Sequence, residues 1–419
     1  MHMKINGFIF IVAILCFSTS TFAGGYRVAL QGQNAAGMAH TGVAVTDSAE
    51  AVFFNPAGMS FLDSDKNFSG GVTLINSITE FENQTTNTSA ENDNPLGTPF
   101  YLYYAQKYNE KVSLGFGVYT PYGNSVVWEK SWAGSHLVND ISLKTIYFQP
   151  TASYQINNKL SIGFGPILVR GSVEFNRDLN TSLVDANDDR SNVTIDASGI
   201  YDWGYNIGVL IKPVKSLSLG ISYRSKVVLE ARDEDADFDN IPGPLGTTFP
   251  DTTYDADLVL PAELTLGVSY LLGTRTLFAF DVNRTFWGAY ENLNVEFKNG
   301  AGTSVNKRNY SDANIFRIGV QHKATNVLTV RGGAYLDKTP IEDGFFTPET
   351  PRNDAIGLTA GASYAATKRL SIDISFLYLR FDEFSGSYDH YEESGSIIPF
   401  GGEYKSTVSS IGLGVSYQY

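Results

Sequence analysis

Stretches in which apolar side chains alternate with small or polar ones recur along the chain. Ile411, Leu413 and Val415 share one face of an extended segment, and glycines lie between them. The same alternation appears at 203–209, 217–224 and 370–378. A period of two residues predicts β-strands, and an apolar face opposite a small or polar face is typical of strands between lipid and an aqueous lumen. A soluble β-sandwich has similar strands, so alternation alone leaves both architectures open.

The connections between these stretches alternate strictly in length. Short turns lie at 109–111, 157–159, 213–216, 273–275, 324–326 and 367–369. Long polar segments separate them, at 82–98, 121–140, 176–200, 233–253, 287–306, 338–353 and 383–401. A sandwich has no reason to place every long loop at one end, whereas a transmembrane barrel has short periplasmic turns and long external loops. The pattern therefore predicts an all-β fold, a 14-stranded antiparallel transmembrane β-barrel, closed because a bilayer tolerates no open sheet edge.

The first 23 residues resemble a secretory signal peptide. Lys4 precedes an apolar stretch at 7–17, and a polar run then ends at Ala23. We expect cleavage after Ala23, with an uncleaved membrane anchor as the alternative. The single cysteine, Cys16, would leave with this segment. The exported chain would then have no disulfide and no thiolate metal site.

Composition excludes several classes of protein. The formal net charge of −14 argues against a nucleic-acid partner, which requires a basic face. The 13% aromatic content argues against a disordered chain. Beyond the predicted signal, no apolar run approaches the ~20 residues that a membrane-spanning helix needs. We find no catalytic motif, no metal spacing and no nucleotide loop. The acidic run at 185–189 has arginine where a calcium loop needs glycine, and we interpret it as a solvated loop.

The segment at 24–59 breaks the alternation and is rich in small residues and turn formers, which suits a compact plug inside a tube. Starting with this segment, the sequence resembles the FadL family of outer-membrane transporters. Members of this family transport long-chain fatty acids, and related members transport aromatic hydrocarbons. The resemblance covers essentially the whole mature chain. Its motifs are Tyr26, Asp47-Ser48-Ala49, Asn55-Pro56-Ala57, Trp203-Gly204, Tyr223-Arg224-Ser225, Leu260-Pro261-Ala262-Glu263 and the C-terminal strand.

The resemblance implies an N-terminal hatch at 24–65 inside a barrel at 66–419. It implies a protein of the Gram-negative outer membrane that takes up a hydrophobic ligand passively, without a cofactor. The ligand would be captured at external loops, bound in the barrel, and released sideways through a gap at strand three. We expect a monomer that contacts lipid and lipopolysaccharide. Its aromatic C-terminal strand resembles the signal read by the barrel assembly machinery. Alternatives are an aromatic hydrocarbon channel of the same fold, a phospholipase-like outer-membrane enzyme, or an adhesin.

Two groups of residues are predicted to control release. Asn55, Pro56 and Ala57 match the hatch motif of the family, which lies against the gap; the alternative is a simple Asn-Pro turn. Gly115, Gly117 and Pro121 lie in or just after strand three. Glycine weakens a hydrogen-bonded ladder and proline lacks a donor, so a kink or local opening costs little there.

Several residues are predicted to bind ligand. Tyr26 matches the N-terminal aromatic residue that reaches the family's pocket. A change of apolar face near Gly165-Pro166 is interpreted as a bulge that turns Arg170 and Glu174 inward. A ligand carboxylate would pair with an inward guanidinium. The alternative is a structural ion-pair ladder with Glu174, Glu230, Asp281 and Asp373. The candidate cations are Arg170, Arg177, Arg224, Arg317, Lys307 and Arg308, and the candidate capture residues of the fourth external loop are Phe238, Leu245 and Phe249.

Overall fold

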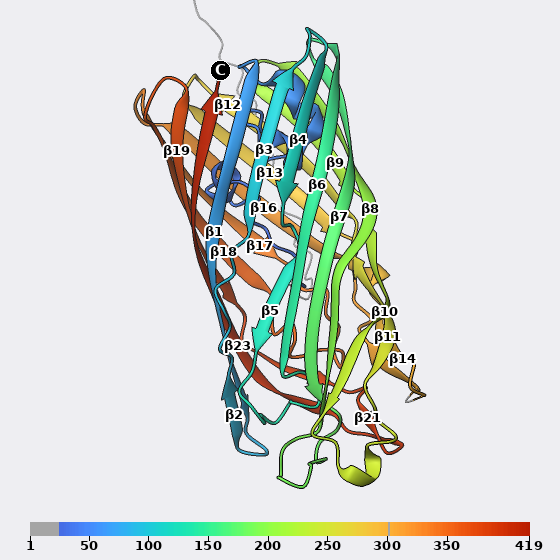
Figure 1. Ribbon diagram of the computed structural model, residues 1–419. Helices are drawn as coiled ribbons and strands as arrows, with labels where there is room; N and C mark the ends of the chain where they lie inside the picture. Colours follow the sequence, from blue (N-terminus) through green and yellow to red (C-terminus); the bar gives the residue numbers. More distant parts are fainter. Residues whose placement is uncertain (1–24, 301) are drawn as a thin grey trace, which may run out of the picture.

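The computed structural model describes residues 25–300 and 302–419, and within them the chain forms a closed antiparallel β-barrel of 14 strands (Figure 1). The prediction from alternation and loop length is therefore confirmed. The predicted signal peptide at 1–23 lies outside the described residues.

Several barrel strands consist of two consecutive ladder segments. In order along the chain the barrel strands are β1 (Lys66–Asn83), β3 (Phe100–Lys107), β4 (Val112–Tyr119) with β5 (Gly123–Val127), β6 (Asp140–Asn157), β7 (Leu160–Asp178), β8 (Asn192–Val214), β9 (Leu217–Arg224) with β10 (Val227–Asp239), β11 (Thr252–Leu260) with β12 (Glu263–Leu272), β13 (Thr276–Thr285) with β14 (Asn292–Phe297), β15 (Gly302–Lys307) with β16 (Ala313–Lys323), β17 (Leu328–Asp337), β18 (Ala355–Ala365), β19 (Leu370–Phe381) with β20 (Phe384–Tyr388), and β23 (Phe400–Gln418). The external connections also contain β2 (Thr88–Glu91), β21 (Glu392–Glu393), β22 (Ser396–Ile397) and the 3-10 turns η2 (Gly243–Leu245) and η3 (Trp287–Ala289).

The first and last barrel strands close the sheet. β1 pairs with β23 from Asn67 opposite Gln418 to Glu82 opposite Glu403. Every backbone group along this seam therefore finds a partner within the wall, as a hydrocarbon environment requires.

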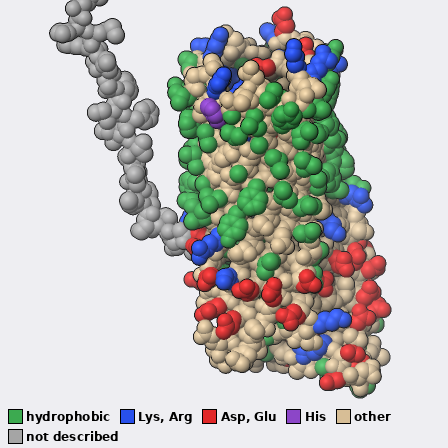
Figure 2. All heavy atoms as spheres, turned by 90° about the vertical axis from the view of Figure 1, so that its left-hand side faces the viewer, with side chains coloured by type: hydrophobic (Ala, Val, Ile, Leu, Met, Phe, Trp, Pro, Cys, Tyr) green, Lys and Arg blue, Asp and Glu red, His purple; other side chains and the backbone are tan. Residues whose placement is uncertain are grey.

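The outer surface carries an apolar belt. In Figure 2, hydrophobic side chains cover the upper part of the wall, nearer the short turns, and charged side chains lie at the rim above this belt and in the lower part of the molecule. Outward residues such as Leu74, Phe164 and Ile318 are exposed although they are large and apolar. Such a belt matches the acyl chains of a bilayer.

The hatch lies inside the barrel near the short turns (Figure 1) and consists of α1 (Gln33–Ala36), α2 (Ala51–Phe54) and η1 (Pro56–Phe61). Glu50 fastens its first helix, because the carboxylate accepts hydrogen bonds from the backbone N–H groups of Asn34 and Ala35 at 3.1 and 3.0 Å. Asp281 of β13 accepts from the N–H groups of Gly42 and Val43 at 2.8 and 3.2 Å. No helix in the described residues is long and apolar enough to cross a membrane.

The external loops are more ordered than predicted. The third loop was expected at 176–200, but β7 continues to Asp178 and β8 begins at Asn192. The fourth and fifth expected loops contain the outer parts of β10 and the hairpin of β14 with β15. Beyond the membrane both faces of a strand contact water or loops, so the alternation ends at the membrane boundary while the ladder continues.

Candidate ligand site and hatch

The third barrel strand is interrupted between β4 and β5. β4 pairs regularly with β3 up to Tyr101 opposite Tyr119, whereas β5 pairs with β6 and with no other strand among the described residues. The hatch segment at 26–28 fills the interruption: the N–H of Val28 donates to the carbonyl of Pro121 at 2.8 Å, and the N–H of Gly123 donates to the carbonyl of Tyr26 at 3.0 Å. A piece of the hatch thus replaces the missing strand partner.

The predicted glycines lie next to this break and not in it. Gly115 and Gly117 belong to the regular β4 ladder, opposite Ala105 and Tyr103 of β3. A Cβ at Gly115 would lie 2.6 Å from the sulfur of Met59, and a Cβ at Gly117 would lie 3.1 Å from a methyl group of Val52. Their lack of side chains makes room for the hatch. Only Pro121, of the predicted gating residues in strand three, occupies the interruption.

The Asn55-Pro56-Ala57 motif contacts a different part of the wall. The side-chain amide of Asn55 donates to the carbonyls of Val43 and Val209 at 2.8 and 3.0 Å, and its oxygen accepts from the N–H of Ala57 at 3.1 Å. The motif therefore caps η1 and seats it against β6, β7 and β8, with Asn55 itself bound to β8. The expectation that it lies against the gap is wrong, since the break is at 120–122.

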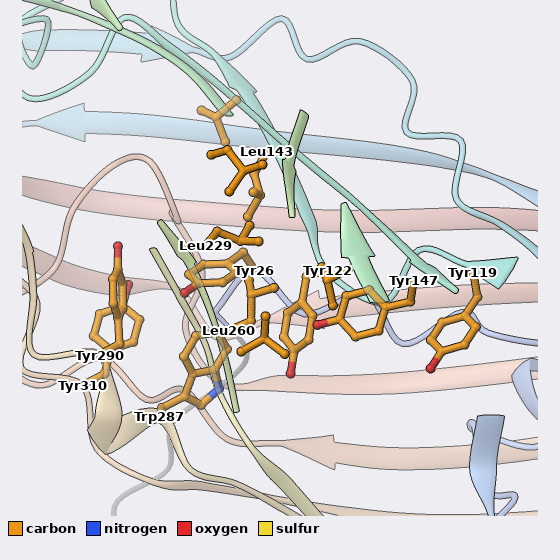
Figure 3. Close-up of a cluster of buried hydrophobic side chains, with 14 of the residues drawn as sticks. Tyr26, Tyr119, Tyr122, Leu143, Tyr147, Leu229, Leu260, Trp287, Tyr290 and Tyr310 are labelled. Atoms are coloured by element: carbon orange, nitrogen blue, oxygen red, sulfur yellow. The ribbon is translucent and has the colours of Figure 1, made fainter. Parts of the chain in front are cut away.

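Aromatic and aliphatic side chains from the hatch and the wall gather beside the break (Figure 3). The ring of Tyr26 lies edge-on to Trp287, Tyr290 and Tyr122, at centroid distances of 4.8, 5.7 and 6.2 Å. Such edge-to-face contacts add to the gain from burial. We call this the aromatic cluster; its members, all buried, are Tyr26, Tyr119, Tyr122, Leu143, Tyr147, Leu229, Leu260, Trp287, Tyr290 and Tyr310.

The predicted inward turn of Arg170 and Glu174 is wrong. Alternation continues through Gly165 and Pro166, and both charged side chains are exposed on the outer face of β7. The apolar residues Ile167 and Val169 point inward and are fully buried. The prediction assumed that apolar side chains face lipid along the whole strand, but in this half of the barrel the lumen is apolar too.

A buried ion pair joins the hatch to the wall. Glu263 of β12 lies 2.7 Å from a guanidinium nitrogen of Arg27 and 3.8 Å from one of Arg224. The same carboxylate accepts from the hydroxyl of Tyr122 and the amide of Asn283, each at 3.1 Å. Sequence reasoning missed Glu263 and Arg27 as site residues. The sequence does contain one indication of Glu263. It begins a run of alternating polar residues, with Thr265 and Ser269, directly after the Leu-Pro-Ala motif, and such residues face the lumen.

The other inward cations have distinct surroundings. Arg224 donates to the carbonyl of Phe53 at 3.0 Å and stacks on its ring at 4.2 Å. Arg317 is 2% exposed and lies opposite Asp281 in the β13–β16 ladder. Two of its guanidinium nitrogens, Nε and Nη2, have no hydrogen-bond partner within the described residues.

The cations predicted near the outside are not equivalent. Arg308 is buried, and its guanidinium lies 2.7 Å from the carboxylate of Glu349. Lys307 is exposed. Arg177 donates to the carbonyl of His136 and the hydroxyl of Ser304, at 3.1 and 3.0 Å. In the fourth loop, Phe238 and Phe249 pack at a centroid distance of 5.7 Å, and Leu245 lies half-buried in η2.

The external connection at 128–139 folds into the mouth of the barrel. The indoles of Trp128 and Trp132 stack at 4.3 Å, and the indole N–H of Trp128 donates to the carbonyl of Pro348 at 3.0 Å. The ring of His136 packs 4.7 Å from Tyr391. Burial, aided by the nearby Arg177, lowers the pKa of His136 from 6.5 to about 4.

The pKa of His136 predicts that this connection loosens in acid. A histidine with a depressed pKa stabilises the packed state above pH 6.5, and this contribution is lost as the pH falls toward 4, by at most about 3 kcal/mol. Tryptophan emission should therefore shift reversibly to the red over this interval. A H136Q variant, which cannot become charged, should not show the shift. Equal shifts in both proteins would contradict the prediction.

Comparison with known proteins agrees with this architecture. The family model described as "Outer membrane protein transport protein (OMPP1/FadL/TodX)" matches residues 14–419. The chain belongs to this family. FadL-family proteins are transporters and channels of the outer membrane, so the protein is an outer-membrane β-barrel.

Relatives named for different substrates resemble the chain to similar degrees. The long-chain fatty acid transport protein of Escherichia coli K12 is 22% identical, over 88% of this chain and 90% of that protein. A FadL homologue of Pseudomonas aeruginosa has a TM-score of 0.81 at 18% identity, covering 95% of this chain and all of that one. The toluene transporter TbuX of Ralstonia pickettii has a TM-score of 0.67 at 19% identity, covering 93% and 98%. At these identities the structures show the fold alone.

Proposed function

We propose that this protein takes up long-chain fatty acids, or molecules of similar hydrophobic character, passively across the outer membrane as a monomer. One observation carries the proposal: the hatch segment that supplies Tyr26 to the aromatic cluster also fills the break in the third barrel strand through Val28. A ligand that displaces Tyr26 would pull the same segment away from Pro121. Binding in the lumen and opening of the wall would then be a single event.

A sideways exit suits an apolar ligand. Each methylene buried in the cluster is worth about 0.8 kcal/mol relative to water. Release through the wall places the chain directly among acyl chains, so this energy is not lost by crossing water. Phe238, Leu245 and Phe249 form an apolar group in the fourth loop that would serve as the place of first capture.

The inward cations favour a fatty acid over an aromatic hydrocarbon. Arg317 is buried with two guanidinium nitrogens lacking a partner within the described residues. Arg308 and Arg177 already bind Glu349, His136 and Ser304, so Arg317 is the cation that a ligand carboxylate would satisfy. A carboxylate pairs with a guanidinium, whereas a hydrocarbon leaves it unsatisfied. Toluene is the runner-up ligand. Uptake of toluene but not of oleate by cells producing the protein would reverse the order.

A disulfide between hatch and wall tests the exit. A Cβ at Gly123 would lie 3.8 Å from a methyl group of Val28, so V28C/G123C brings two cysteines together across the break without altering the Arg27–Glu263 pair. In cells lacking their own transporter, we expect uptake of labelled oleate to fall to the empty-vector level when this pair is oxidised and to recover on reduction. The two single-cysteine variants are the controls. An oxidised variant that transports at the wild-type rate would exclude this exit.

A further inference from the structure

Two cations stand together on the outer wall, on neighbouring strands. Lys144 of β6 and Arg170 of β7 are both exposed and face away from the lumen. In the ladder, Lys144 is opposite Ser172 and Ile146 is opposite Arg170. The two cations are therefore diagonal neighbours on one face, a spacing of about 7–8 Å that long side chains bridge readily. We refer to Lys144 and Arg170 as the cationic pair.

Strand β8, next to β7, indicates the depth of the cationic pair in the membrane. On β8, Tyr201 is opposite Arg170 and Trp203 is opposite Leu168. Both aromatic side chains project outward, with 59% and 65% exposure. Tyrosine and tryptophan gather where acyl chains meet head groups. Toward the short turns the same face of β7 continues with Phe164 and Ile162, which are exposed and apolar. The cationic pair thus lies at the outer edge of the apolar belt.

Neither cation forms an ion pair with the part of the chain that the structure describes. Two other outward arginines are neutralised by neighbours: Arg232 lies 2.6 Å from Asp257, and Arg284 lies 2.9 Å from Asp312. Among the described residues, no carboxylate lies within 4.0 Å of the side-chain nitrogens of the cationic pair, and no hydrogen bond reaches them. Glu174, the other diagonal neighbour of Lys144, does not come within that distance either. Two positive charges therefore face the head-group layer with no partner.

We infer that the cationic pair binds the phosphate of a phosphorylated glycolipid in the outer leaflet. A phosphate accepts a bidentate hydrogen bond from arginine and attracts lysine as a point charge, so one phosphate can satisfy both cations. The acyl chains of such a lipid would extend along Phe148, Leu168 and Trp203, and its sugars would meet Tyr201, which is opposite Arg170. The pair of charges favours a phosphate over a fatty-acid carboxylate, which has only a single charge. This inference does not depend on what the lumen carries.

The test measures lipid binding to the purified full-length barrel. Lipid A with both phosphates, and the same lipid after enzymatic dephosphorylation, are each titrated onto the protein in dodecyl maltoside, and bound lipid is counted by native mass spectrometry. We expect wild-type protein to prefer the phosphorylated lipid, and K144Q/R170Q to lose at least about tenfold in affinity for it, as expected for losing charge-assisted hydrogen bonds. The control K159Q/K215Q removes two exposed lysines from short turns at the opposite end and should bind as wild type.

The outcomes separate the proposal from its rivals. Heat-modifiable migration shows that each variant is folded. Wild-type protein that binds both lipids equally, or K144Q/R170Q that retains phosphorylated lipid A, would overturn the proposal. If lipid A binding persists in K144Q/R170Q while oleate uptake falls, the cationic pair instead serves the carboxylate of the exiting ligand. The proposal is supported if K144Q/R170Q loses lipid A binding, K159Q/K215Q keeps it, and oleate uptake is unchanged in both variants.

Discussion

Replacing Glu263 by alanine should release the hatch from the wall while the barrel remains folded. Glu263 is 4% exposed and binds Arg27 of the hatch, Tyr122 at the break and Arg224 of the wall. Removing one member of a buried ion pair costs about 3–5 kcal/mol, because the remaining charges stay buried without compensation. Most of this cost would weaken the binding of the hatch segment to the wall and not the folding of the barrel. The segment can move away from the wall, and Arg27 can then be hydrated.

Entry of a large hydrophilic antibiotic into cells, together with conductance in planar bilayers, measures the loss of the seal. Both should rise in E263A, whereas heat-modifiable migration should be unchanged. The control is E296Q, which breaks the exposed contact between Glu296 and Lys298; the Glu296 side chain is 63% exposed. Exposed pairs contribute only about 0–1 kcal/mol, so this variant should behave as wild type. An E263A barrel as tight as the control would show that the aromatic contacts alone hold the segment.

A side chain at Gly163 should displace the other end of the hatch. A Cβ there would lie 2.4 Å from the backbone of Pro56 and Ala57, and no flexible side chain could move aside to admit it. Overpacking a well-filled interior costs about 1–3 kcal/mol, and a clash with backbone falls at or above the upper end. G163V should therefore unseat η1 from β7 and β8 and make the barrel leak.

The control for this experiment is G332V. Gly332 is also a strand glycine, but a Cβ there would meet only the carbonyl of Thr359, at 3.8 Å. This variant should assemble and remain sealed, since valine suits a β-strand. If G163V and G332V leak equally, the effect comes from the strand and not from the contact between η1 and the wall. If neither leaks, η1 does not contribute to the seal.

Particular residues show where sequence reasoning succeeded. Loop lengths and alternation predicted the closed barrel, because both follow directly from contact with lipid on one side and water at each end. Tyr26, which the resemblance predicts to reach a ligand pocket, lies in the aromatic cluster, and its contact with a ligand stays a prediction. Pro121 was expected to mark a weak point in strand three, and it lies in the break. Proline has no backbone N–H, so at this position no hydrogen-bond donor is left without a partner in the ladder.

Other residues show where it failed. Arg170 was expected to face the lumen because apolar side chains were assumed to face lipid, yet Ile167 and Val169 line an apolar lumen. The Asn55-Pro56-Ala57 motif was placed at the gap, although it seats η1 against β7 and β8. Glu263 was noted as part of a motif and not as the carboxylate that joins the hatch, the break and the wall. Its partners Arg27 and Tyr122 are distant in sequence.

The sequence by itself determined that this chain is exported, forms a closed barrel of alternating strands and carries a small-residue plug, because each property follows from local composition and periodicity. Only the tertiary structure decided which side chains share the lumen, where the third barrel strand breaks and what fills that break. Those features depend on contacts between segments far apart in the chain. A period of two residues shows which side chains share one face of a strand, but it does not show whether that face contacts lipid, water or another part of the protein.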